Sequence, residues 1–171
     1  MSKLVLDGQT FKTLVTNGCQ SLINDIDRIN ALNVFPVPDG DTGTNMRMTI
    51  EGGVKAIIAD NEASIGLMAK KLSRAMTMSA RGNSGVILSQ FFKGLSLGLE
   101  EKDEVNAVEL AVAFDAGNNS GVLSSEACAS LMKQAKKSSI VSNDEAFLLA
   151  TSVASLITVN IVPSVGFWTT L

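Results

Sequence analysis

The chain contains no histidine and no tyrosine, and only two of its 171 residues are cysteine. Without histidine, the sequence excludes a histidine general base, a histidine metal ligand, a Ser-His-Asp triad and a phosphohistidine relay. Cys19 and Cys128 are too few for a disulfide framework or a zinc site. Because Cys19 falls on the apolar face of an expected helix, we predict a buried and unreactive thiol there.

Basic and aromatic residues are also scarce. The 14 Lys and Arg are outnumbered by 17 Asp and Glu, the formal net charge is −3, and aromatic residues make up 5% of the chain. Nucleic acid is therefore not an expected partner, because binding to its phosphate backbone needs clustered Lys and Arg. Residues 1–8 lack the apolar stretch of a secretory signal, so we expect a cytoplasmic protein.

Charged residues are missing from the whole stretch after Glu145, which raises the question of a membrane span. Polar side chains nevertheless recur there at helical spacing, at Thr151, Ser155 and Thr158 among others. We therefore predict a neutral amphipathic helix that packs within the domain and ends before Pro163, and no membrane span.

Apolar residues are plentiful, at 46% of the chain, which is enough to bury a full core. They recur three and four positions apart, which is typical of amphipathic helices, and no segment alternates as a strand does. The sequence predicts an all-α fold, an antiparallel helical barrel or bundle of about seven or eight helices in one domain over residues 1–171. The expected helices cover 9–31, 44–59, 64–79, the stretch from a loop at 82–85 to residue 99, 105–116 and 124–137, with a loop at 117–121.

An acidic turn at residues 33–45 is the first candidate for a functional site. Asp39 and Asp41 flank a glycine, two prolines stiffen the approach, and Thr42 or Thr44 is expected to cap the next helix. The carboxylates are suited to Mg²⁺, and the backbone amides of residues 42–45 are suited to phosphate. The alternative is a capped loop whose aspartates simply lie near a helix dipole.

A second glycine-flanked loop, at residues 81–85, also leads into a helix. Its amides could bind another anion, with Arg81 facing a phosphate. The alternative is a turn between helices that Asn83 or Ser84 caps. Two helices separate this loop from the acidic turn, so we expect both at the same end of an antiparallel bundle.

Together, the segments L-N-V-F-P-V-P-D-G-D-T-G-T-N-M (residues 32–46) and A-R-G-N-S-G-V-I-L-S-Q (residues 80–90) are far more specific than either one alone. They closely resemble the ATP-binding N-terminal domain of bacterial fatty acid kinase, which is related to the L subunit of dihydroxyacetone kinases. The resemblance covers roughly residues 9–117. The family's later E-G-T-I-L-T-V and D-S-G-G segments are not recognisable here.

This resemblance implies a helical barrel that binds ATP and two Mg²⁺ ions at one end. It implies that Asp39 and Asp41 are the catalytic, metal-binding carboxylates, and Asn33 is the nearest candidate for a third ligand. The residues that it implies at the phosphates are Thr42, Gly43, Thr44, Asn45, Gly82, Asn83 and Ser84.

The implied function is Mg²⁺-dependent phosphoryl transfer from ATP to an acyl carboxylate that a DegV-like, fatty-acid-binding partner protein presents. One alternative is a dihydroxyacetone kinase-type phosphotransfer subunit, although Thr42 stands where that group usually has histidine. Another is a nucleotide-binding regulatory module without turnover. Oligomer formation is compatible with all three readings.

Overall fold

The computed structural model describes residues 5–33 and 39–135, with side chains as far as residue 121. Within these residues the fold is all-α, as predicted, and its single β feature is an antiparallel bridge between Leu6 and Val105. The helices are α1 (Gly8–Asn24), α2 (Ile26–Ala31), α3 (Thr42–Ile57), α4 (Ile65–Ser79), α5 (Gly82–Gly98) and α6 (Ala107–Ala135). The helix predicted after residue 145 and the stiff segment at 34–38 lie outside the described residues.

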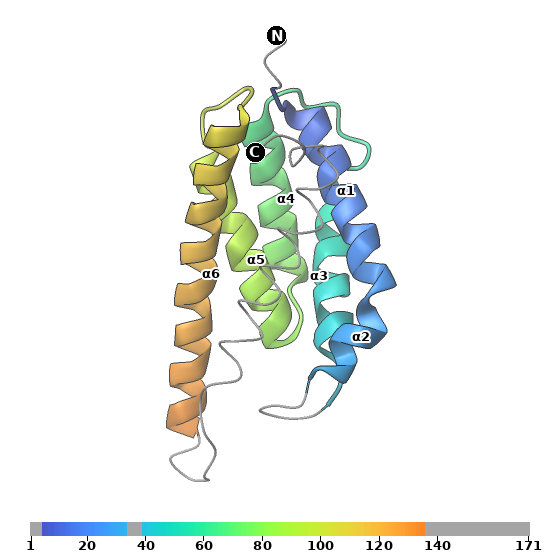
Figure 1. Ribbon diagram of the computed structural model, residues 1–171, viewed down its shortest axis with the longest axis vertical. Helices are drawn as coiled ribbons and strands as arrows, with labels where there is room; N and C mark the ends of the chain where they lie inside the picture. Colours follow the sequence, from blue (N-terminus) through green and yellow to red (C-terminus); the bar gives the residue numbers. More distant parts are fainter. Residues whose placement is uncertain (1–4, 34–38, 136–171) are drawn as a thin grey trace, which may run out of the picture.

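Successive long helices run antiparallel, with α4 and α5 in the middle of the bundle (Figure 1). Helices α1 and α3 pack on one side of this pair, and α6 packs along α5 on the other. The end of α2 and the start of α3 lie at the same end of the bundle as the turn between α4 and α5 (Figure 1). The two loops that the sequence singled out therefore share one end of the bundle, as predicted.

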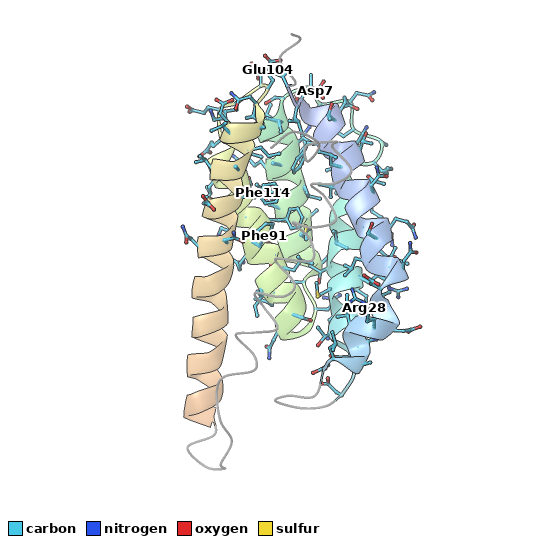
Figure 2. The ribbon with its side chains drawn as sticks, in the orientation of Figure 1. Asp7, Arg28, Phe91, Glu104 and Phe114 are labelled. Atoms are coloured by element: carbon cyan, nitrogen blue, oxygen red, sulfur yellow. The ribbon has the colours of Figure 1, made fainter. Side chains whose placement is uncertain are left out.

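The core is built mainly from the inward faces of α3, α4 and α5. In α4, Met68, Leu72 and Met76 are fully buried, which follows from their spacing of four residues along one face. Between α5 and α6, the rings of Phe91 and Phe114 lie with their centroids 5.9 Å apart (Figure 2). Such contacts fix how α6 sits on the rest of the bundle.

Cys19 is buried on the inner face of α1, as predicted. Burial in an apolar environment raises the pKa of its thiol, and the negative charge of Glu51 on α3 raises the pKa further. A thiol with a raised pKa is a poor nucleophile, which agrees with the expectation of an unreactive cysteine.

The loop predicted at residues 117–121 is wrong, because α6 continues through it without a break. Gly117 serves close packing instead of a turn. A Cβ atom on Gly117 would lie 3.0 Å from the Phe91 ring and from the Phe91 carbonyl oxygen, so only glycine lets α5 approach this closely. Tertiary packing thus overrides the local preference of a glycine- and asparagine-rich stretch for a loop.

The single helix predicted over residues 9–31 is divided in two at Asp25. The Asp25 amide donates to the Leu22 carbonyl, with the nitrogen 3.1 Å from the oxygen, which tightens the last turn of α1. Helix α2 then packs as a short separate element against the start of α3. This change of path brings the polar residues of α2 to the acidic turn.

Candidate functional site

The two aspartates of the acidic turn are both exposed and are separated by Gly40, whose φ of +64° is in the left-handed region that favours glycine. Asp41 is the N-cap residue of α3. Asn33 is buried beside them, and its Nδ2 donates to Oδ1 of Asp39 at 2.7 Å. The structure therefore brings the predicted third ligand next to the first predicted carboxylate.

The first turn of α3 is capped from another helix. Oδ1 of Asn30 accepts the backbone N–H of Gly43 at 2.7 Å and that of Thr44 at 3.3 Å. Nδ2 of Asn30 also donates to Oγ1 of Thr44 at 3.2 Å. The prediction that Thr42 or Thr44 caps this helix is therefore wrong, because α3 already begins at Thr42 and its cap is the side chain of Asn30.

Most of the backbone amides predicted to bind phosphate at the start of α3 have partners within the protein. Asn30 takes the amides of Gly43 and Thr44, and the Asn45 amide donates to the Asp41 carbonyl at 2.8 Å. These residues can meet a ligand through their side chains, but their amides are used in holding the helix start. The role of residues 42–45 at a phosphate stays a prediction.

The second loop differs, because α5 starts at Gly82 and the side chain of its N-cap residue, Arg81, makes no capping hydrogen bond. Neither Asn83 nor Ser84 caps the helix, which removes the alternative reading of this loop as a capped turn. Gly82 has a φ of +57°, and both Gly82 and Asn83 are exposed. The first two residues of α5 are therefore open to solvent, at a helix start that suits an anion.

The two loops are in direct contact. Oγ of Ser84 donates to the Thr42 carbonyl at 3.2 Å, and a Cβ atom on Gly82 would lie 2.5 Å from Nδ2 of Asn45. The glycine at position 85 is packed in the same way, since a Cβ there would overlap Oγ1 of Thr49. The start of α5 is therefore seated on the first two turns of α3.

Sequence reasoning missed two residues that hold this end of the bundle together. Thr49 is fully buried, and its Oγ1 donates to the Asn45 carbonyl at 2.8 Å and accepts the Arg81 amide at 3.2 Å. The position of Thr49 within the apolar face of α3 could have indicated a buried, hydrogen-bonded hydroxyl. Asn30 falls within the single helix predicted over residues 9–31, and no spacing in the sequence indicated the break that brings it to the start of α3.

The donor set fits a magnesium ion that shares its coordination with phosphate. The oxygens come from the carboxylates of Asp39 and Asp41 and from the side-chain carboxamide of Asn33. In proteins, Mg²⁺ ordinarily takes one or two carboxylates, phosphate oxygens and several waters. Within residues 5–33 and 39–135, no group of three or more His, Cys, Asp or Glu side chains gathers that could hold a metal ion. The residues therefore suit an ion delivered with a nucleotide better than an ion held by protein alone.

Two arginines, Arg47 and Arg81, belong to the α3 and α5 segments near the candidate site. Arg47 lies in the second turn of α3, and its Nε is buried without a hydrogen-bond partner. Arg81 is exposed, and its Nη1 donates to the Ala80 carbonyl at 3.1 Å. Both guanidinium groups are permanently charged, and that of the exposed Arg81 can meet a phosphate from solvent.

Residues 36–120, which include both loops except the start of the acidic turn, match the DAK2 domain. The site-bearing part of the chain is therefore similar to the DAK2 domain, over a stretch just short of half the chain.

Individual relatives match a longer stretch of the chain than the family model does. The chain is 48% identical over 117 residues to Protein YloV of Bacillus subtilis (strain 168), a match over 68% of this chain and 21% of that protein. It is 46% identical over 112 residues to uncharacterized protein SH1689 of Staphylococcus haemolyticus (strain JCSC1435), over 66% of this chain and 20% of that protein. The chain thus spans about a fifth of the length of the curated relatives it matches.

None of the helices in the described part of the chain combines the length and the apolar character needed to cross a membrane. The charge-free stretch that raised this question lies outside the described residues.

Proposed function

We propose that the chain is the ATP-binding, Mg²⁺-dependent phosphoryl-transfer domain of a two-component kinase. The observation that carries the proposal is the direct contact between the acidic turn and the 81–85 loop, in which Ser84 bonds to Thr42 and Gly82 lies on Asn45. An exposed pair of carboxylates thereby lies beside an exposed helix start. Phosphoryl transfer requires this combination, because positioning and charge neutralisation do most of the catalytic work.

The chain's own residues would divide the work between two neighbouring helix starts. Asp39 and Asp41 would hold Mg²⁺, with Asn33 as an oxygen donor or as the partner that orients Asp39. Gly82, Asn83 and Ser84 would bind phosphate oxygens at the start of α5, with Thr42 and Asn45 completing the site from α3. When bound, Mg²⁺ would supply positive charge that offsets the negative charge developing during transfer.

The acceptor is proposed to be a fatty acyl carboxylate that a DegV-like partner protein presents. The absence of histidine fits this division of labour, because a carboxylate acceptor carries no proton that a general base must remove. The resemblance of the two loops to fatty acid kinase supports the acyl substrate, and the DAK2 match supports the kinase family.

Calorimetry of ATP binding with and without Mg²⁺ tests the first half of the proposal. The variants Asp39→Asn and Asp41→Asn keep the shape of each side chain and an oxygen that can accept a hydrogen bond, but they remove the charge. We expect each to weaken Mg²⁺-dependent ATP binding by at least about 10-fold, the smallest effect usual for disturbing even an outer-shell partner of a metal. Asp27→Asn, at an exposed aspartate of α2, is the matched control.

Transfer is tested by mixing the chain and Mg-ATP with a fatty-acid-loaded, DegV-like protein or with a dihydroxyacetone kinase sugar-binding subunit. Acyl phosphate in the first mixture supports the proposal, and phosphorylation of dihydroxyacetone in the second would replace the acyl substrate by the sugar.

A second candidate is a nucleotide-binding regulatory module without turnover. It is favoured by the lack of a third carboxylate near Asp39 and Asp41 among the described residues. Tight Mg-ATP binding without product in either mixture would select this candidate.

A further inference from the structure

The structure assigns Asn30 a role as a positioning residue for the metal-binding turn, an inference that rests on the function proposed above. Asn30 is bonded through both ends of its carboxamide. The oxygen accepts the amides of Gly43 and Thr44, and the nitrogen donates to the Thr44 hydroxyl. One side chain of α2 thus fixes the first turn of α3 through three hydrogen bonds.

Asn30 acts together with Asn33, which lies three residues further along the chain. The backbone N–H of Asn33 donates to the backbone carbonyl of Asn30, with the nitrogen 3.1 Å from the oxygen. This bond joins the two residues in one turn at the end of α2. Asn33 holds the carboxylate of Asp39, while Asn30 holds the turn that Asp41 begins. The end of α2 therefore supports both proposed metal ligands, one through each asparagine.

The close packing of Gly43 against α2 brings the Asn30 side chain within reach of the turn. Gly43 has no side chain, and a Cβ atom there would lie 2.9 Å from the Ile26 carbonyl and 3.1 Å from Oδ1 of Asn30. Because α3 packs so closely on α2, the short side chain of Asn30 can reach the backbone amides of Gly43 and Thr44. Groups that orient a metal ligand in this way ordinarily set the affinity for the ion without touching it.

The test compares Asn30→Ala with Asn30→Asp in the full chain. Asn30→Ala removes all three hydrogen bonds. Asn30→Asp keeps two oxygens that can accept the amides, and the Thr44 hydroxyl can reverse and donate to the carboxylate. Asp7→Ala serves as a control for general destabilisation, because it removes the cap of α1 at the opposite end of the bundle (Figure 2).

Two measurements separate a positioning role from a purely structural one. Hydrogen exchange at the amides of Gly43 and Thr44, without ligand, reports the cap itself. Electron paramagnetic resonance of Mn²⁺ titrated into the chain with ATP reports the metal. We expect Asn30→Ala to speed exchange at both amides and to weaken Mn²⁺ affinity by about 10-fold or more. Asn30→Asp should restore both, and Asp7→Ala should change neither.

The inference is overturned if Asn30→Ala binds Mn²⁺ as the wild type does, or if Asp7→Ala weakens the metal equally. Failure of the wild type to bind Mn²⁺ or Mg²⁺ with ATP would be a different result. It would remove the proposed function, and this role with it, whatever the exchange data show about the cap.

Discussion

The hydroxyl of Ser84 donates to the backbone carbonyl of Thr42, across 42 positions of sequence. The bond joins the first turn of α5 to the first turn of α3. Because each of these turns belongs to one of the two loops that the sequence singled out, the bond makes a single site from two distant motifs.

Replacing Ser84 by alanine should loosen this junction. The bond is partly buried and neutral, so we expect Ser84→Ala to lower the free energy of unfolding by about 0.5–1.5 kcal/mol, measured by urea denaturation without nucleotide. Asn83→Ala, at the exposed neighbouring residue, should stay within about 0.5 kcal/mol of the wild type. Equal losses in the two variants would show that the Ser84–Thr42 bond does not stabilise the fold.

Two glycine-to-alanine substitutions should have opposite signs. A methyl group on Gly85 would overlap Oγ1 of the buried Thr49, so Gly85→Ala should destabilise the chain by about 1–3 kcal/mol. At Gly121, within α6, the nearest atom to a new Cβ is the Phe91 Cβ at 3.7 Å, which is ordinary contact. Gly121→Ala should therefore stabilise by about 0.4–1 kcal/mol through the lower entropy of the unfolded chain. Thermal unfolding of both variants checks the pair, and a stabilising Gly85→Ala would contradict the described packing of α5 on α3.

Asp7 should make stability depend on pH in acid. Its Oδ1 accepts the Thr10 amide at 2.8 Å, and this backbone hydrogen bond holds the pKa of the carboxyl below its ordinary value. The unfolded chain then takes up the proton at a higher pH than the folded chain does. The contribution of Asp7 is therefore fully present above the ordinary aspartate pKa, and it is lost as the pH falls through the lower pKa of the folded state.

Urea denaturation of the wild type, Asp7→Ala and Asp7→Asn at several pH values checks this. Asp7→Ala should cost about 1 kcal/mol at neutral pH, and the difference from the wild type should shrink in acid. Asp7→Asn keeps an oxygen for the Thr10 amide but cannot titrate. A difference between the wild type and Asp7→Ala that is the same at every pH would show that the Asp7 carboxylate is not coupled to folding.

Most of the fold follows from apolar spacing, because burying one face of each helix is the dominant constraint. The span predicted as 64–79 became α4 (Ile65–Ser79) with its N-cap at Ser64, since both the periodicity and the cap are local signals. The prediction failed at Asp25 and at residues 117–121. At both places the outcome depends on packing against another helix, which a reading of local residues does not contain.

The candidate site, like the fold, was predictable only in part from the sequence. The sequence placed the two loops at one end, because that follows from counting antiparallel helices. It misjudged how α3 is capped, because the acceptor, Asn30, lies on a different helix and becomes available only where the first helix breaks. Long-range polar contacts of this kind leave no periodic trace in a sequence.

The bridge between Leu6 and Val105 bears on where this folding unit can be cut. Its two hydrogen bonds, with N–O distances of 2.8 and 3.0 Å, tie the residues before α1 to the connection between α5 and α6. The segment 36–120, expressed by itself, would lose both hydrogen bonds of this bridge, together with α1 and α2. The segment of family similarity therefore omits contacts that the described fold makes, and a fragment designed for the binding experiments should retain the residues from Leu6 onward.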